Sequence, residues 1–154
     1  MATLLIIHHT PSPALQALLE AVADGAGTDA IADVEVVLRP ALTCPETDVL
    51  DADGYVLGTP ANLGSMSGAL KHCFDRIYYP CLEATRGRPY GLYVHGNSDT
   101  TGAVRSVEKV VTGLSWQQVA PTLESVGSPD QATLDQAWEL GATVAARLSE
   151  ETPT

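Results

Sequence analysis

The chain has 154 residues, of which 45% are hydrophobic, and its formal net charge is -11 at pH 7. This length suits one compact domain with a single hydrophobic core. The negative charge argues against nucleic acid and anionic membranes as partners, because both would repel the protein. Small molecules and basic proteins remain as classes of partner.

The N-terminus and the cysteines indicate where in the cell the protein is found and whether its thiols are free. The first residues, MATLLIIHH, contain no basic segment, and no apolar stretch approaches the ~20 residues of a membrane span. We therefore expect a cytoplasmic protein. Cys44, Cys73 and Cys81 lack CxxC spacing, which predicts neither a disulfide framework nor a metal site. We expect free, mostly buried thiols.

Apolar runs and helical periodicities alternate along the chain. The first run, TLLIIH, has no polar alternation and is typical of a parallel strand covered on both faces. In chain order we expect a strand at 3–8, a helix at 14–26, a strand at 34–38, one helical turn at 46–50, a strand at 54–59, a helix at 67–79 ended by Pro80, a strand at 90–95, a helix carrying 104–114, a strand near 117–124 and a helix at 129–150.

Five strands alternating with about five helices predict an α/β protein, a three-layer sandwich with helices on both faces of a parallel sheet. We expect one domain over residues 1–150 and a frayed tail at 151–154. Both common doubly wound strand orders fit this pattern. The dinucleotide-binding version needs G-x-G-x-x-G after the first strand, where this chain has HTPSPA, so a dinucleotide site there is not expected.

Residues 58–76, GTPANLGSMSGALKHCFDR, are the most informative segment, because a loop of small residues follows a buried strand and opens a helix. Similar loops occupy 10–15 and 96–102. In a sheet of order 2-1-3-4-5 the ends of strands one, three and four lie side by side, so these loops would share one edge. The hydroxyls of Thr10 and Ser12, with the free amides of a helix start, suit a phosphate. Helix capping and ordinary turns are the alternative interpretations of each loop.

Three motifs resemble those of the flavodoxin-like superfamily of FMN proteins, especially its NAD(P)H-dependent oxidoreductases and quinone reductases. They are HTPSPAL after the first strand, GTPANLGSMSG with Lys71 and Phe74-Asp75-Arg76, and the loop 96–102. The resemblance covers nearly the whole chain and implies a five-stranded parallel sheet of order 2-1-3-4-5.

The resemblance also implies an FMN site. The phosphate would lie on Thr10, Ser12, Pro13, Ala14 and Leu15. The ring edge would face Pro60, Ala61, Asn62, Leu63 and Gly64. The pyrimidine side would meet His95, Gly96, Asn97, Ser98, Thr100, Thr101 and Gly102.

This chain departs from the family pattern in two places. Pro13 removes an amide donor, and Leu15 stands where a third polar residue is usual. Leu63 stands where an aromatic ring clamp is common, which leaves a face of the flavin open to small substrates.

We therefore expect an FMN-dependent oxidoreductase that accepts hydride from NAD(P)H and reduces a small acceptor such as a quinone or free flavin. No catalytic side chain is expected, because the flavin N5 performs the chemistry. Because related reductases build part of the site at the subunit interface, the resemblance is compatible with a homodimer, and the oligomeric state stays open. The alternatives are an electron-transfer flavodoxin that docks a basic redox partner and a flavodoxin-like domain that binds FMN poorly or not at all.

Overall fold

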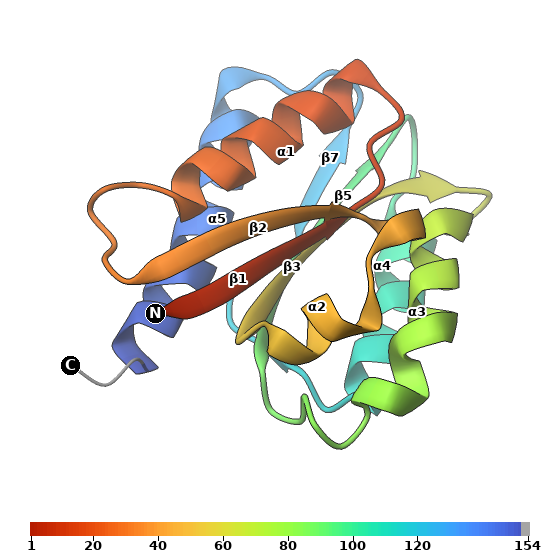
Figure 1. Ribbon diagram of the computed structural model, residues 1–154. Coiled ribbons are helices and arrows are strands. Elements are labelled where there is room, and N and C mark those ends of the chain that lie inside the picture. The colour runs from red at the N-terminus through yellow and green to blue at the C-terminus, as the bar shows by residue number, and fades with distance from the viewer. Residues whose placement is uncertain (152–154) are drawn as a thin grey trace.

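The computed structural model describes residues 1–151, which form one sheet between two layers of helices (Figure 1). The elements are β1 (Ala2–His8), α1 (Pro13–Ala26), β2 (Val34–Pro40), the 3-10 turn η1 (Ala41–Thr43), α2 (Glu46–Asp51), β3 (Gly54–Asn62), β4 (Ser65–Met66), α3 (Gly68–Cys81), β5 (Pro89–Gly96), α4 (Thr101–Gly113), β6 (Gln117–Gln118), β7 (Leu123–Val126) and α5 (Gln131–Glu151). The predicted alternation of strands and helices is confirmed. The helix α5 includes Glu151, which we expected in the frayed tail, and 152–154 lie outside the described residues.

The sheet has seven strands rather than the five we expected, and its main path runs β2-β1-β3-β5-β6. The parallel core β2-β1-β3-β5 confirms the predicted parallel arrangement. The two additional strands are short. The strand β4 pairs antiparallel with the end of β3, and both β6 and β7 pair with β5.

The strand that we expected near residues 117–124 is divided into β6 and β7. The amide of Val119 still donates to the Tyr90 carbonyl at 3.1 Å, so the interruption follows that residue. Pro121 has no N–H to contribute to the ladder with β5, and proline in a strand favours such a break. Pairing resumes at Leu123, opposite Tyr93.

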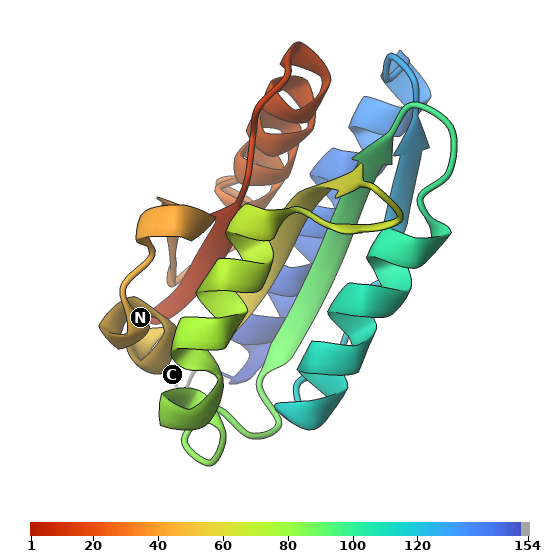
Figure 2. The same ribbon diagram turned by 90° about the vertical axis from the view of Figure 1, so that its right-hand side faces the viewer.

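Each face of the sheet has its own core. Leu4 and Ile6 of β1 pack in the cluster with α1 and α5, whereas Leu5 and Ile7 pack in the cluster with α2, α3 and α4. Figure 2 shows α3 and α4 side by side over one face, with α1 and α5 behind the sheet. Because successive side chains of a strand point to opposite faces, a strand apolar at every position is buried on both.

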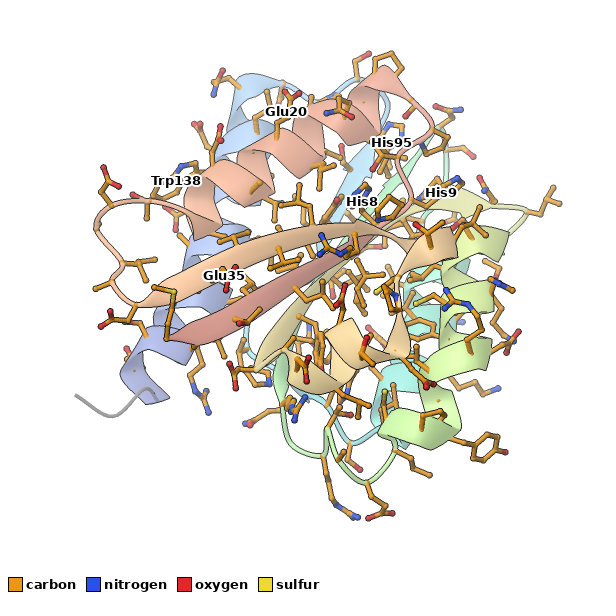
Figure 3. The ribbon with its side chains drawn as sticks, in the orientation of Figure 1. His8, His9, Glu20, Glu35, His95 and Trp138 are labelled. Carbon is orange, nitrogen blue, oxygen red and sulfur yellow. The ribbon has the colours of Figure 1, made fainter. Side chains whose placement is uncertain are left out.

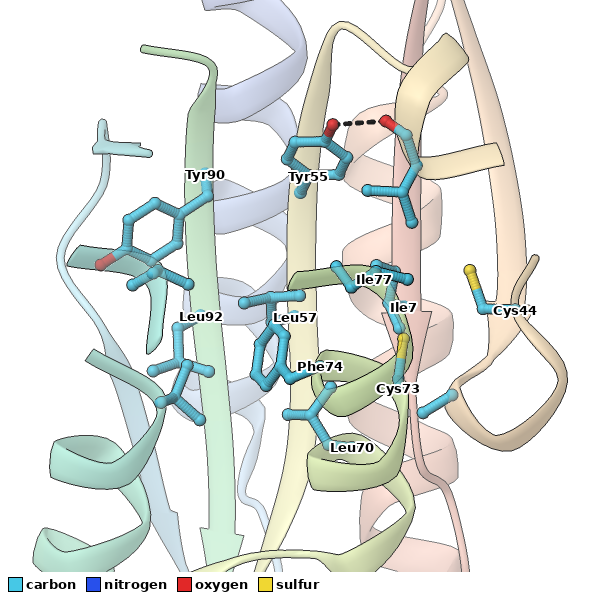
Figure 4. Packing of buried hydrophobic residues seen from close by; sticks show 14 of the residues in the cluster. Ile7, Cys44, Tyr55, Leu57, Leu70, Cys73, Phe74, Ile77, Tyr90 and Leu92 are labelled. Atoms are coloured by element: carbon cyan, nitrogen blue, oxygen red, sulfur yellow. Dashed lines mark hydrogen bonds between the residues drawn. The ribbon is translucent and has the colours of Figure 1, made fainter. Parts of the chain in front are cut away.

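The helix α3 continues through Pro80 to Cys81, so our prediction that Pro80 ends it is wrong. Pro80 lies in the last turn, where only one helical hydrogen bond depends on its missing N–H. The turn after the helix satisfies one of its last carbonyls, since the Thr85 hydroxyl donates to the Cys81 carbonyl at 2.7 Å. Phe74 and Ile77 of this helix fill the core beside Leu57 and Leu92 (Figure 4).

Candidate functional site

The ends of β1, β3 and β5 lie in line at one edge of the sheet, as the three-loop prediction requires. His8 is paired with Gly58, and Gly58 with Tyr93, across the three strands. The predicted loops follow these positions directly. Figure 3 shows His8, His9 and His95 gathered at this edge.

The first loop leads into α1, whose first turn contains Pro13, Ala14 and Leu15. Ser12 is the N-cap, and its Oγ accepts the Leu15 amide at 3.3 Å. The Leu15 side chain is buried in the core below, so only its backbone belongs to the loop surface. The capping interpretation of Ser12 is therefore correct. Its hydroxyl proton has no acceptor among the described residues.

The backbone donors of this loop are few. Pro11 and Pro13 carry no N–H, and the amides of Leu15 and Gln16 are used by the cap. The amides of Ser12 and Ala14 donate to no group in the described part of the chain. Two free amides at the positive end of a helix, with a hydroxyl between them, still favour an anion.

Two histidines precede this loop and extend its set of polar groups. His8 Nδ1 and Thr10 Oγ1 share a hydrogen bond of 2.7 Å. Burial, and then the charge of His9, lower the pKa of His8, which keeps this imidazole neutral near pH 7. The His9 Nδ1 atom is buried without a hydrogen-bond partner. His8, His9 and Thr10 line one side of a pocket of about 250 Å³, and residues 40–42 line the other.

The second loop is a β-hairpin rather than the simple strand-to-helix turn that we weighed as its alternative. Pro60, Ala61 and Asn62 continue β3, and the antiparallel strand β4 returns along them. Leu63 and Gly64 form the two-residue turn, with φ angles of 50° and 75°. Positive φ at both turn positions is the geometry of a type I′ hairpin.

Leu63 is unusual in both its conformation and its exposure. A leucine in the left-handed region is strained, because its Cβ approaches the following carbonyl. Its relative exposure is 106%, so no packing within the described residues compensates for the strain. Strain of this kind concentrates at functional positions.

The start of α3 fixes the base of the hairpin. Thr59 Oγ1 accepts the Ser67 amide at 3.0 Å, and Ser67 Oγ accepts the Leu70 amide at 3.2 Å as the N-cap. The Met66 amide donates to Ser106 Oγ of α4 at 2.9 Å. The hairpin therefore stands on α3 and α4.

The third loop is shorter than we expected. His95 and Gly96 belong to β5, and Thr101 and Gly102 to α4, so 97–100 alone connect them. The His95 ring is buried, with Nε2 at 2.8 Å from the Gly127 carbonyl. Its contact is thus with the loop after β7, while Asn97 and Ser98 are exposed.

Two carboxylates accept hydrogen bonds from residues of this third loop. The Thr100 hydroxyl donates to Glu124 Oε1 of β7 at 2.8 Å, instead of capping α4. Asp99 Oδ1 accepts the Thr101 amide at 3.0 Å, and this bond lowers the pKa of Asp99. Sequence reasoning missed Glu124. Its position on the strand beside β5, near that strand's carboxyl end, is the signal that could have found it.

The second and third loops touch each other. A Cβ on Gly102 would lie 2.0 Å from the Gly64 carbonyl oxygen, so glycine at 102 allows the hairpin to rest on α4. A Cβ on Gly96 would lie 3.3 Å from Ala61 Cβ. A flat ligand would therefore meet a joined surface made by both loops, with Leu63 projecting beside it.

A buried hydroxyl underlies the same edge. The ring of Tyr93 lies over the backbone of Gly58, because a Cβ built on Gly58 would lie 2.1 Å from Tyr93 Cζ. The Tyr93 side chain is fully buried, and its hydroxyl has no hydrogen-bond partner. Burial raises the pKa of Tyr93, so the group stays protonated.

The donor set of this edge fits a phosphorylated flavin. Hydroxyls, helix amides and the unpartnered His9 Nδ1 suit a phosphate at the first loop, and the hairpin and α4 amides suit a heterocycle beside it. Within residues 1–151 no group of three or more His, Cys, Asp or Glu side chains could hold a metal ion. No helix among these residues is long and apolar enough to cross a membrane.

Comparison with known proteins points to the same chemistry. The sequence model of the NADPH-dependent FMN reductase family matches residues 14–131. A flavodoxin of Aquifex aeolicus is 34% identical over 77 residues, which cover 50% of this chain and 40% of that protein. The chain thus matches well under half of that relative's length.

Solved structures share the fold. A WrbA-like flavodoxin from Agrobacterium tumefaciens has a TM-score of 0.78 at 18% identity, over 99% of this chain and 100% of that one. The flavodiiron core of Flv1 from Synechocystis sp. PCC6803 has a TM-score of 0.81 at 17% identity, over 98% of this chain and 37% of that one. These likenesses establish a flavodoxin-like fold.

The match of the family model extends over most of the chain, from the first helix to the start of the last. This match supports FMN as the cofactor. This chain belongs to the NADPH-dependent FMN reductase family.

Proposed function

We propose that the protein is an FMN-dependent oxidoreductase that takes hydride from NAD(P)H and reduces a small acceptor such as a quinone or free flavin. The observation that carries the proposal is the convergence of three small-residue loops at the ends of β1, β3 and β5, in a chain of this family. Ligands of open α/β sheets bind at this edge.

The first loop would hold the FMN phosphate. The free amides of Ser12 and Ala14 and the hydroxyl proton of Ser12 would donate to its oxygens. When His8 Nδ1 donates to Thr10, the Thr10 hydroxyl proton is also available to the phosphate. The unpartnered His9 Nδ1 lies in the adjoining pocket and would complete the set.

The second and third loops would hold the flavin ring. Backbone amides of the hairpin and of 97–102 would hydrogen-bond its polar edge and stabilise negative charge on it. When bound, FMN supplies the ring nitrogen N5 that accepts a hydride. The protein supplies orientation, and a nicotinamide held ~3–3.5 Å from that atom would react without a protein acid or base.

Anaerobic mixing of the FMN-loaded protein with NADPH or NADH tests the proposal. We expect flavin absorbance near its long-wavelength maximum to bleach with at least one nucleotide, and to return when a quinone is added. A protein that does not retain FMN contradicts the cofactor assignment. An FMN-loaded protein that neither nucleotide reduces contradicts the reductase activity alone.

A second candidate function is electron transfer to a basic protein partner. It is favoured by the net charge of -11 and by the similarity to a flavodoxin. A small acceptor needs an open flavin face, whereas a protein partner needs charge complementarity. Reduction by a basic electron-transfer protein that falls steeply with salt, with no reduction by NAD(P)H, would favour this function.

Further expectations accompany the proposal. A homodimer and a cytoplasmic location stay predictions, as do the single domain over 1–150 and the absence of a nucleic-acid partner. Analytical ultracentrifugation of the full chain with and without FMN would determine the oligomeric state.

A further inference from the structure

The strand β2 forms one free edge of the sheet. The path of strands ends at β2, which pairs only with β1 among the described strands. Its seven residues include no buried one, and the last three, Leu38 to Pro40, are exposed. Figure 1 shows β2 as the outer strand beside β1. A strand of this length with one free side can pair with a further strand.

The backbone groups of β2 that face away from β1 follow from the alternation along a strand. The Ala2 amide donates to the Asp33 carbonyl at 2.9 Å, so this carbonyl points toward β1. Successive residues direct their backbone groups to opposite sides, which leaves the N–H and C=O groups of residues 34, 36 and 38 facing outward. Arg39 Nη1 donates to the Leu38 carbonyl at 3.0 Å, in agreement with an outward carbonyl. A carbonyl can accept a second hydrogen bond.

The side chains of β2 alternate between the two faces of the sheet. Val37 packs against the core with α2 and α3, and Val36 against the core with α1 and α5. Glu35 and Arg39 therefore share the face of Val37, whereas Leu38 shares the face of Val36. One face of this edge thus carries a carboxylate and a guanidinium on either side of a valine, and the other face carries apolar side chains.

We propose that two copies of the chain join their β2 strands antiparallel about a two-fold axis at Val37. In this register Val36 lies opposite Leu38 of the second copy, and their outward N–H and C=O groups pair. Glu35 lies opposite Arg39 of the second copy. Each contact occurs twice because the interface is isologous. The two sheets become continuous, and the apolar side chains of 36 and 38 cover each other on one face.

The charges of β2 favour this register over the alternatives in which outward-facing residues meet. A shift by two residues in either direction places a charged side chain opposite Val37. A shift by four places two glutamates or two arginines opposite each other, which destabilises a strand pair. Glu35 makes no ion pair with a described residue, while Arg39 Nε lies 2.7 Å from Asp48 Oδ2. In the dimer this guanidinium would lie between two carboxylates.

The proposed interface is small and leaves the three-loop edge open. A single pair of strands lies at the low end of specific interfaces, so we expect a Kd of roughly 1–100 μM. Because the paired strands run antiparallel, the carboxyl ends of the two sheets point in opposite directions. The dimer therefore contributes nothing to the flavin site, and the inference does not rest on the proposed FMN chemistry.

Association of the full chain is the first test. Analytical ultracentrifugation over about 1–500 μM protein, which brackets that Kd, should show a reversible equilibrium of monomer and dimer. Hydrogen exchange measured by NMR locates the interface. The amides of Val36 and Leu38 should exchange at least ~10-fold more slowly at high than at low protein concentration. The Gly127 amide donates to the Gly96 carbonyl at 2.9 Å, so the amides of Glu124 and Val126 face outward at the opposite edge and should not change.

Charge reversal tests the register. Glu35→Arg and Arg39→Glu each place like charges opposite each other, so each should raise the Kd of the dimer roughly 10- to 100-fold. An equimolar mixture of the two variants has opposite charges at every such contact and should form heterodimers with nearly the wild-type Kd. Glu20→Arg on α1 and Lys109→Glu on α4 make the same charge changes elsewhere and should dimerise as the wild-type protein does.

The possible outcomes decide the proposal. A wild-type protein that stays monomeric at the highest concentration overturns it. A dimer that persists in both Glu35→Arg and Arg39→Glu, or that leaves the Val36 and Leu38 amides unprotected, uses another surface and also overturns it. Circular dichroism establishes that each variant is folded, and the exchange experiment needs no variant. Failure of FMN binding or of reduction by NAD(P)H would change none of these results, so the two proposals fail separately.

Discussion

At the scale of single residues, Ser12 has two roles that one substitution separates. Aspartate caps a helix as well as serine does and favours the positive helix end, so Ser12→Asp should change the free energy of unfolding by less than about 0.5 kcal/mol. The added charge would face the FMN phosphate. We expect FMN to bind roughly 10- to 100-fold more weakly, as flavin fluorescence titration measures.

Riboflavin, which lacks the phosphate, is the control ligand for Ser12→Asp. Its affinity should be the same for the variant and the wild-type protein, because no phosphate meets the new carboxylate. An equal loss of affinity for FMN and riboflavin would mean that the substitution disturbs the ring site or the fold. Unchanged FMN binding would place the phosphate elsewhere.

The buried hydroxyl of Tyr93 lowers the stability of the fold. A fully buried hydroxyl without a hydrogen bond has lost its contact with water and gained nothing in exchange. Tyr93→Phe removes that group and keeps the ring over Gly58. We expect the free energy of unfolding of the FMN-free protein to rise by about 1 kcal/mol in urea denaturation.

Tyr55 supplies the opposite case for comparison. Its buried hydroxyl donates to the Val49 carbonyl and accepts from Arg88 Nη1 at 3.1 Å. Tyr55→Phe should therefore lower the free energy of unfolding, by about 1 kcal/mol, because it removes both hydrogen bonds of this hydroxyl. Arg88 Nη1 would still donate to the carbonyls of Val49, Leu50 and Ala52. A loss of stability in Tyr93→Phe as well would reveal a partner of the Tyr93 hydroxyl, such as a trapped water.

At the scale of elements, the β3–β4 hairpin combines a strained turn with an exposed apolar tip. Asparagine tolerates the left-handed conformation of Leu63, and Asn-Gly is the preferred sequence for this turn. The exposed leucine loses no packing when it is replaced. Leu63→Asn should therefore raise the free energy of unfolding by about 1 kcal/mol in urea denaturation.

The same variant tests whether the strain at Leu63 has a function. If the leucine covers one side of the flavin, Leu63→Asn should weaken the binding of both FMN and riboflavin several-fold. Gly64→Ala is the control for turn geometry, because it adds strain at φ 75° and keeps the leucine. A Leu63→Asn protein that is more stable and binds flavins normally would leave the leucine without a role at the ring.

The elements themselves were largely predictable from the sequence. The strand β1 and the helix α1 were predicted to within a residue or two at each end, because apolar runs and helical periodicity are local signals. The hairpin was not predicted. Only two residues form β4, and a Leu-Gly pair is a weaker turn signal than Asn-Gly.

Contacts between elements were the part of the site that could not be predicted from the sequence. The three loops were predicted to share an edge because strand order determines that arrangement. The bond of His95 to Gly127, and that of Thr100 to Glu124, depend on side-chain orientations and on how β7 lies beside β5. The same is true of the contact of Gly64 with Gly102, which joins the second and third loops.

At the scale of the whole molecule, the candidate phosphate loop differs in charge from the rest of the protein, which carries an excess of negative charge. The first turn of α1 contains no acidic side chain, and two histidines precede it. An anion that approaches this edge therefore meets amide dipoles, hydroxyls and imidazoles in an otherwise acidic protein. The arrangement favours a phosphate held by hydrogen bonds over one held by fixed cations.

The stability of the fold should depend on pH through His8. Burial lowers the pKa of His8 from 6.5 in the folded protein, so the unfolded chain binds more protons as the pH falls through 6.5. Unfolding is therefore favoured by acid in this range, and the free energy of unfolding should fall as the pH is lowered through 6.5, until the folded His8 is protonated as well.

Urea denaturation at intervals between about pH 7.5 and 5.5 measures this dependence, since most carboxylates titrate below that range. His8→Asn removes the titration and keeps a side chain that can hydrogen-bond Thr10. The decline of stability with falling pH should be shallower in His8→Asn than in the wild-type protein, whereas His72→Asn, on the exposed side of α3, should retain the wild-type decline. Equal declines in all three proteins would mean that His8 is protonated as readily in the folded state as in the unfolded chain. A protonated His8 would still donate from Nδ1 to the Thr10 hydroxyl, so that outcome would remove the pH dependence assigned to His8 and would leave the Thr10 hydroxyl proton available to the phosphate.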